Sequence, residues 1–441
     1  MGNFFTSVFK LEERKTNIST EVTAGVTTFM TMAYIIFVNP GILSQTGMPA
    51  GALMVSTCLA AAFASLLMAF LANYPVALAS GMGLNAFFTF TVCLGMNISW
   101  QAALAAVFVE GVIFILLTLT KVREKVVNGI PSSLKYGISA GIGLFIAFIG
   151  FQSGQMVVDN PATLVSQAHF KDNLPALLTL AGLVVIGALE AFRIKGAILW
   201  GILIITALAI PLGLTQLPSA IVSAPPSISP IFMAMDFSGI GFNFTDPAVV
   251  NFWLIVFTFL FVDFFDTVGT LVGVCSRSGL MDENGKLPKA REALLADAIG
   301  TVGGAVLGVS TVTSYVESAA GVGVGGRTGL TAVVTALLFL LSIFFSPLIS
   351  IVPACATAPA LIFVGIYMLM GIRHINFDDW TELLPAAAAI FTMPFTYSIA
   401  SGIEFGMITY AAVKLLSGRI KDISIISWAL ALVFIVKELF V

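Results

Sequence analysis

Apolar residues follow one another in long runs along this chain, and only short polar segments separate the runs. Most runs hold roughly 15–25 residues, and a helix needs about 20 apolar residues to cross the hydrocarbon core of a bilayer. We therefore predict an all-α polytopic membrane protein. The pattern indicates fourteen spans, at 22–44, 50–72, 76–94, 99–120, 132–151, 174–191, 196–216, 248–275, 291–308, 311–325, 328–346, 356–372, 380–397 and 400–417. A further apolar stretch, 423–440, is either a short span or a helix on the membrane surface.

The composition agrees with this class and argues against several others. Hydrophobic residues make up 58% of the 441 residues and charged residues only 10%, with a mean hydropathy of +1.03. The longest polar stretch, 276–293, has the length of a loop, so no soluble domain is expected. No basic tail or patch suggests a nucleic-acid partner. The four cysteines and two histidines are isolated in sequence, which argues against disulfides and metal sites.

The positions of Lys and Arg support fourteen spans. Inner loops of membrane proteins are enriched in both residues. With a cytoplasmic N-terminus, the residues on the inner side are Lys10, Arg14, Lys15, Lys121, Arg123, Lys125, Lys135, Arg193, Lys195, Arg277, Lys286, Lys289, Arg291, Arg327, Arg373, Lys414, Arg419 and Lys421. Only Lys171 and Lys437, of the 20 Lys and Arg, are not among them. The chain is therefore predicted to be a multi-pass protein of the cell (inner) membrane.

Two spans at corresponding positions of the two halves are unusual. Seven spans per half would make the halves run in opposite directions, as in inverted-repeat transporters. The third span reads YPVALASGMGLNAFFTF (74–90), and the tenth reads VSTVTSYVESAAGVGVGG (309–326). Each has an extended-looking segment followed by a glycine-rich helix. Such short, interrupted spans point to a central binding site, because their free backbone groups must face protein or a wet cavity.

Polar residues in these apolar runs are the candidate site. A charged side chain at the bilayer centre costs roughly 2.5–3.5 kcal/mol on insertion scales, and residues that costly usually line a substrate or proton pathway. The candidates are Asn85 and Glu317 at the two breaks, Asp263 and Asp266 in the eighth span, and Asp297 in the ninth. Asp263 and Asp266 are three residues apart, so they share roughly one helical face.

Each candidate also has a structural interpretation. The eighth-span acids would form a polar pair against a neighbouring helix, and Glu317 would cap its helix. Asn85 would satisfy freed backbone groups, and Asp297 would interact with its helix dipole. For two other buried-looking acids, Glu110 in AAVFVEGVIF and Glu404, we favour a structural role.

Several segments resemble one known family of membrane proteins. GMGLNAFF (81–88), FVDFFDTVGTLVGV (261–274), ADAIGTVGG (296–304), TSYVESAAGVGVGGRTGLTAVV (313–334) and TTFMTMAYIIFVNP (27–40) resemble the azaguanine-like purine permeases, of the nucleobase–ascorbate transporter superfamily. The resemblance covers nearly the whole chain. It implies two intertwined inverted repeats of seven spans.

The resemblance also implies two domains, each built from both halves. A core domain would comprise 1–130 and 248–350, and a gate domain 131–247 and 351–441. The substrate would lie between them, held largely by the third, eighth and tenth spans. Relatives are commonly dimers, so a homodimer is an expectation.

The resemblance further implies a function and residue roles. The family carries purine nucleobases by proton symport, with no cofactor besides the proton, and the pairing of motifs is closer to carriers of hypoxanthine and guanine. Asn85, Asp263, Asp266 and Glu317 match substrate-binding positions. Asp266, Asp263 and Asp297 match positions for proton coupling or its support. Replacing Asp263 or Asp266 by Asn is expected to abolish uptake driven by a pH gradient.

Other functions are compatible with parts of this sequence. The same architecture could carry another nucleobase, namely adenine, xanthine or uracil, or an inorganic anion, although an anion fits poorly beside several acids. An intramembrane aspartyl protease needs its two acids on facing helices, whereas Asp263 and Asp266 lie on one helix. We therefore expect a transporter and not an enzyme.

Overall fold

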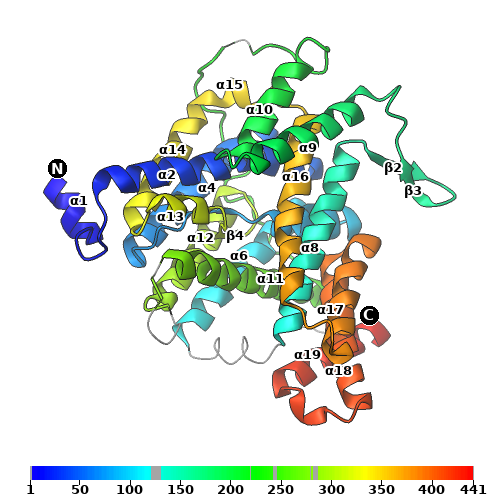
Figure 1. Cartoon of the computed structure of the whole chain (residues 1–441). Helices are drawn as coiled ribbons and strands as arrows, with labels where there is room; N and C mark the ends of the chain where they lie inside the picture. The colour runs from blue at the N-terminus through cyan, green and yellow to red at the C-terminus, as the bar shows by residue number, and fades with distance from the viewer. Residues whose placement is uncertain are drawn as a thin grey trace.

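The computed structural model describes residues 2–120, 131–218, 220–241, 246–278, 280–281 and 287–440. Four residues of the predicted inner loops, Lys121, Arg123, Lys125 and Lys286, lie outside these ranges. The described chain is mostly helical, which confirms the predicted fold class (Figure 1). Within it, nine helical segments are long and apolar enough to cross a membrane, and three shorter apolar helices accompany them.

The elements of the first half cover the first seven predicted spans. They are α1 (Gly2–Phe9), α2 (Ile18–Met32), α3 (Ile35–Leu43), η1 (Ser44–Thr46), α4 (Ala50–Leu71), β1 (Leu78–Ser80), α5 (Met82–Ala86), η2 (Phe87–Gly95), α6 (Trp100–Leu119), α8 (Ser132–Ser153), β2 (Val157–Asn160), β3 (Leu164–Gln167), α9 (Leu174–Ala191) and α10 (Ala197–Ala209).

The second half covers the remaining spans. Its elements are α11 (Pro247–Ser278), α12 (Ala290–Leu307), β4 (Val312–Ser314), α13 (Ser318–Val324), α14 (Gly329–Ser342), η3 (Ile343–Phe345), α15 (Ser346–Ile349), α16 (Ala354–Leu369), η4 (Met370–His374), α17 (Trp380–Thr396), α18 (Ile399–Leu416), η5 (Ile420–Asp422) and α19 (Ile425–Phe440). The stretch 423–440 is thus a helix, and whether it crosses the membrane stays open.

Three local features differ from the sequence prediction. The first span is broken at Ala33 and Tyr34 into α2 and α3, where the Thr31 hydroxyl bonds to the carbonyl of Thr28 and competes with the helix ladder. The second part of the third span, η2, is a π-helix. Between the fifth and sixth spans, β2 and β3 form an antiparallel hairpin that projects from the helical body (Figure 1).

The helices pack in two groups. In one, α4 lies against α12 and α14, α12 against α6, and α2 against α13 and α14. In the other, α8 lies against α16 and α17, α9 against α10 and α16, and α17 against α18. Figure 1 shows α8 and α16 running side by side. The helices of the first group lie in the ranges predicted for the core domain, and those of the second group lie in the ranges predicted for the gate domain. The division into these two domains stays a prediction.

Close backbone contact between α8 and α16 depends on a glycine. A Cβ added at Gly365 would lie 2.3 Å from the carbonyl oxygen of Gly143 and 2.8 Å from the Cβ of Ala147. We expect Gly365→Ala to destabilise the protein by about 1–3 kcal/mol, the usual cost of overpacking. Gly187→Ala is the matched control, because its nearest neighbour would be 3.6 Å away. Thermal unfolding of both purified variants in detergent measures the difference, and equal unfolding temperatures would contradict the packing argument.

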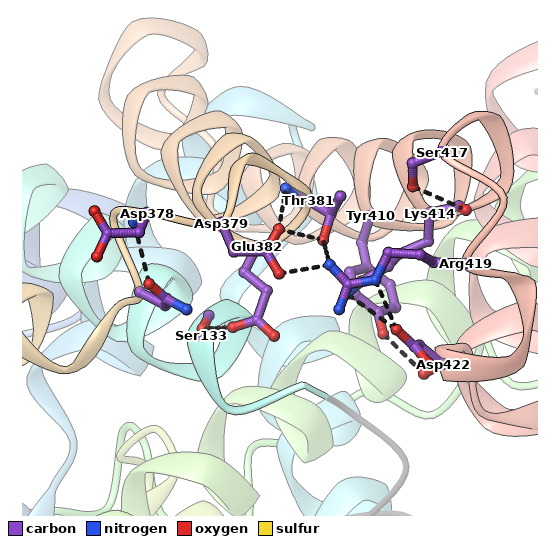
Figure 2. Close-up of polar contacts among 11 residues, drawn as sticks. Ser133, Asp378, Asp379, Thr381, Glu382, Tyr410, Lys414, Ser417, Arg419 and Asp422 are labelled. Atoms are coloured by element: carbon purple, nitrogen blue, oxygen red, sulfur yellow. Dashed lines mark hydrogen bonds and ion pairs between the residues drawn. The ribbon is translucent and has the colours of Figure 1, made fainter.

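A polar cluster joins the ends of three helices, α8, α17 and α18 (Figure 2). The Arg419 guanidinium donates to Asp379 at 2.7 Å and to Asp422 at 2.9 Å. Lys414, which is buried on α18, lies 3.7 Å from the same Asp422 carboxylate. The Ser133 hydroxyl at the start of α8 donates to Glu382 in the first turn of α17. The cluster therefore ties α8, α17 and α18 together at one end.

Asp379 gives this cluster a pH dependence. Hydrogen bonds from the Thr381 hydroxyl and from Arg419 hold the pKa of Asp379 well below its ordinary value. Its contribution to stability is therefore present above the unfolded pKa of about 3.9, and it is lost as the pH falls toward the folded pKa. We expect Asp379→Asn to lower the unfolding temperature slightly at neutral pH, with a difference from wild type that shrinks in acid. Asp378→Asn is the control, because Asp378 donates a hydrogen bond to Asn376 through its backbone N–H and not through its carboxylate. A pH-independent difference for Asp379→Asn would contradict the assignment.

Candidate functional site

The two broken spans meet through their extended segments. β1 and β4 pair antiparallel, with Leu78 opposite Ser314 and Ser80 opposite Val312. Backbone hydrogen bonds extend the pairing at both ends, from Gly81 N–H to the Thr311 carbonyl and from Tyr315 N–H to the Ala77 carbonyl. Backbone groups freed by the helix breaks are thus satisfied across the two halves of the chain, as a membrane interior requires. This crossing positions the residues on either side of each strand.

Glu317 lies three residues after the end of β4, at the N-cap of α13. The Tyr34 hydroxyl donates to its Oε1 at 2.6 Å, and the Thr31 hydroxyl lies 3.4 Å from its backbone carbonyl. Tyr34 reaches this position because the chain turns between α2 and α3. One carboxylate oxygen of Glu317 therefore has a fixed phenolic donor, which orients the carboxylate.

Asp266 on α11 lies close enough to Glu317 and to Tyr315 for their charges and dipoles to interact. Both acids are partly exposed, whereas Tyr34 and Tyr315 are buried. The Tyr315 hydroxyl in turn donates to the carbonyl of Ser80 in β1. The structure thus brings two of the predicted site residues together beside the strand crossing.

Asn85 has a different environment. It is fully buried on α5, and its Oδ1 accepts from the Ser80 hydroxyl at 2.8 Å and from the Ser310 hydroxyl. Its Nδ2 lies 3.9 Å from the Met82 sulfur. Ser80 belongs to β1, and Ser310 lies two residues before β4. The amide of Asn85 therefore fastens the two extended segments to each other.

Asp263 and Asp297 lie in a third place. Both are fully buried. The Thr267 hydroxyl donates to Asp297 at 2.9 Å and lies 3.5 Å from Asp263, and the Ser314 hydroxyl lies 3.3 Å from Asp297. The expectation that Asp263 and Asp266 share one face needs refinement, because Asp263 is buried among neighbouring polar groups while Asp266 is partly exposed.

The structure also contains a cavity near the end of the third span. A cavity of about 380 Å³ is lined by Phe87, Thr91, Asn251, Thr258 and Tyr397, among others. Its walls come from η2, the first half of α11 and the link between α17 and α18. None of the five predicted site residues lines it. The cavity is therefore distinct from the places that hold the predicted site residues.

Sequence reasoning missed the phenolic and hydroxyl partners of these groups. Tyr34, Tyr315, Thr267 and Ser310 each touch a predicted site residue or a strand of the crossing. A weak signal was present, since the chain has 37 Phe and only 7 Tyr, and two of these Tyr lie within the segments quoted as motifs. Among the described residues, no group of three or more His, Cys, Asp or Glu could hold a metal ion.

The arrangement can recognise a small polar solute. The partly exposed Asp266 and Glu317 provide several hydrogen-bond acceptors, and acceptors in a buried place select ligands with matching donors. A mostly helical membrane protein with two crossing broken spans and intramembrane acids belongs, by fold and site, to the secondary transporters.

Comparison with known proteins identifies the family within this class. The chain belongs to the Permease family (Xan_ur_permease), whose model matches residues 19–405. A putative permease of Methanocaldococcus jannaschii is 48% identical, over 98% of both chains. The adenine permease AdeP of Escherichia coli is 45% identical, over 98% of this chain and 96% of the relative. The guanine/hypoxanthine permease PbuG of Bacillus subtilis is 44% identical, over 98% of this chain and 99% of the relative.

A solved structure shares the fold. The transmembrane domain of the cyanobacterial bicarbonate transporter BicA aligns with a TM-score of 0.65 at 16% sequence identity, covering 87% of this chain and 97% of that one. The likeness supports the architecture alone. The chain is accordingly a multi-pass nucleobase permease by family.

Proposed function

We propose that this protein imports purine nucleobases, above all hypoxanthine and guanine, by proton symport. The observation that carries the proposal is the pair of partly exposed acids, Asp266 and Glu317, beside the crossing of two broken spans. Relatives named as guanine/hypoxanthine permeases and adenine permeases support the substrate class. The protein acts as a carrier and not as an enzyme, and it needs no cofactor besides the coupling proton.

The chemistry of an oxopurine fits these acceptors. Guanine presents its N1–H and its 2-amino group side by side, and hypoxanthine presents the N1–H alone. A carboxylate accepts hydrogen bonds from such donors, and a bound base without them leaves the carboxylate unpaired. Adenine has a bare N1 acceptor at the corresponding edge. Asp266 and Glu317 hold the base in this proposal, with Asn85 and Asp263 supporting the crossing and the proton site.

Transport follows from movement of the core domain against the gate domain. The base binds between the domains from the outer side, and the site then opens to the cytoplasm, where base and proton are released. The chain works in the cell (inner) membrane with its N-terminus in the cytoplasm, as a homodimer like its family.

Adenine is the alternative substrate, because an adenine permease and a guanine/hypoxanthine permease are almost equally similar to this chain. Uptake of radiolabelled hypoxanthine into proteoliposomes, with an inward pH gradient, tests the proposal. Unlabelled guanine is expected to compete strongly, and adenine, xanthine and uracil weakly. Strong competition by adenine alone would replace the substrate assignment, and uptake that ignores the pH gradient would overturn proton symport.

A further inference from the structure

Glu110 lies in the middle of α6, and its side chain is fully buried. Neither of its carboxyl oxygens has a hydrogen bond of ordinary geometry in the described part of the chain. No ion pair to Glu110 occurs there either. A carboxyl group in such a place is an unexplained cost, because an ionised carboxylate without partners is strongly disfavoured away from water. The structural role favoured from the sequence does not account for it.

The polar groups that interact with Glu110 are the carboxyl of Asp263 and the hydroxyl of Thr311, with the carboxyl of Asp297 next to them. They interact with it without forming a hydrogen bond of ordinary geometry. α6 comes close to α12 at the neighbouring residue, where a Cβ added to Gly111 would lie 2.8 Å from the Val302 side chain. The Glu110 carboxyl is therefore held within the core helices.

The charged groups on the elements around Glu110 are nearly all acids. α6 carries no other charged residue. α11 contributes Asp263 and Asp266, with Arg277 in its last turn, and the segment from β4 to α13 contributes Glu317. α12 contributes Asp297, with Arg291 and Glu292 in its first turn. Within the described residues, the surroundings of the Glu110 carboxyl thus favour a bound positive charge.

Two carboxyl groups that interact with each other in a buried place are not both ionised, because like charges repel strongly away from water. Such a pair holds a proton between its members and titrates as a unit. A carboxyl pair of this kind binds a proton without further ligands, so the proton is the cation that this pair suits.

We infer that Glu110 and Asp263 form a proton-binding site inside the core domain, separate from the purine site at Asp266 and Glu317. The inference rests on the proposed proton symport. It assigns the coupling proton to a pair that includes Glu110, which lies outside the motifs that carry the family resemblance. The proton is carried within the core domain as this domain moves, and the burial of both side chains shields it from solvent.

Hydroxyl groups connect this site to the purine site. The Thr267 hydroxyl bonds to Asp297, lies 3.5 Å from Asp263, and shares a hydrogen bond of 2.8 Å with the Thr313 hydroxyl. Thr313 lies in β4, four residues before Glu317, and Asp266 follows Asp263 by one helical turn on α11. A change of charge at the Glu110–Asp263 pair therefore acts on both elements that carry the purine-binding acids.

The first experiment compares the wild type with Glu110→Gln in proteoliposomes. Purine counterflow without any gradient measures binding and domain movement, and accumulation under an inward pH gradient measures coupling. A gradient of one pH unit supports about tenfold accumulation for one proton per purine. We expect Glu110→Gln to retain counterflow and to lose this accumulation. Glu404→Gln, which neutralises a buried acid of the gate domain, is the matched control and should retain both.

The outcomes separate this inference from the proposed function. If wild-type protein shows no purine counterflow, the proposed function fails. If counterflow is present and Glu110→Gln accumulates purine like the wild type, the proton site fails. Accumulation in the wild type that follows a sodium gradient instead of a pH gradient would also overturn it.

A second measurement does not depend on whether Glu110→Gln folds. Dicyclohexylcarbodiimide reacts with protonated carboxyl groups in apolar surroundings, and mass spectrometry of the labelled wild type locates the modified residues. We expect labelling of Glu110 or Asp263 that falls as the pH is raised, and less labelling of the partner once one member has reacted. Absence of label from both residues in acid, with other buried acids labelled, would overturn the inference.

Discussion

Glu317→Gln is expected to weaken purine binding by about 10- to 100-fold, since hydrogen bonds to charged groups contribute about 1.5–3 kcal/mol. The substitution keeps the size of the side chain and removes the charge that accepts from the Tyr34 hydroxyl and to which the proposed function assigns binding of the base. Isothermal titration of purified protein with guanine measures the loss. We expect the unfolding temperature to change little, because Glu317 is partly exposed and its carboxylate is not part of the strand pairing.

Tyr34→Phe provides a graded control for this experiment. It removes the donor that orients the Glu317 carboxylate and leaves the charge in place, so a smaller loss of affinity is expected. Unchanged affinity for guanine in Glu317→Gln, with the protein folded, would remove Glu317 from the purine site and leave it the role of a helix cap.

Asn85→Ala is expected to reduce stability and purine binding together. The amide accepts from Ser80 and from Ser310, and leaving such buried donors unsatisfied costs about 1–3 kcal/mol. Loss of this link loosens the crossing of β1 and β4, from which Glu317 is positioned. Thermal unfolding and guanine titration of the purified variant measure the two effects.

A double-mutant cycle distinguishes two roles for Asn85, namely holding β1 and β4 together and contacting the base directly. If Asn85 acts through Ser310, then Ser310→Ala reproduces much of the effect, and the two substitutions are clearly less than additive, with a coupling of about 0.5–3 kcal/mol. Additive effects, together with an altered preference between guanine and hypoxanthine in Asn85→Ala alone, would indicate that Asn85 binds the base itself.

Much of the fold could be predicted because membrane spans have a strong and simple signal. Length and apolar composition located the helices to within a few residues, and glycines with β-branched neighbours located the extended segments that became β1 and β4. The break at Tyr34 escaped prediction, since no glycine or proline marks it in the sequence, and the Thr31 and Tyr34 hydrogen bonds that accompany it are visible only in the structure. The β2–β3 hairpin escaped because it lies in a polar segment, where hydropathy carries no information.

The candidate site could be predicted as a set of residues but not as an arrangement. Burial in apolar runs singled out the five polar side chains, and the sequence placed them on the right elements. The structure divides them into three groups: the partly exposed pair Asp266 and Glu317, Asn85 between the two strands, and the buried acids Asp263 and Asp297. This division depends on the rotation of α5, α11 and α12 about their axes. Helical spacing alone does not fix that rotation. The interaction of Glu110 with Asp263, which lies far away in sequence, is visible only in the structure.

The antiparallel pair formed by the third and tenth spans has a consequence for biogenesis. Ser310, whose hydroxyl meets that of Ser80, follows it by 230 residues. At a synthesis rate of about 5–20 residues per second, the ribosome needs roughly 10–50 seconds to make the second strand after the first. During that interval the first strand has no pairing partner in the membrane, where backbone N–H and carbonyl groups without hydrogen bonds are strongly disfavoured. The insertion machinery or neighbouring helices must therefore shelter the nascent N-terminal half until its counterpart arrives.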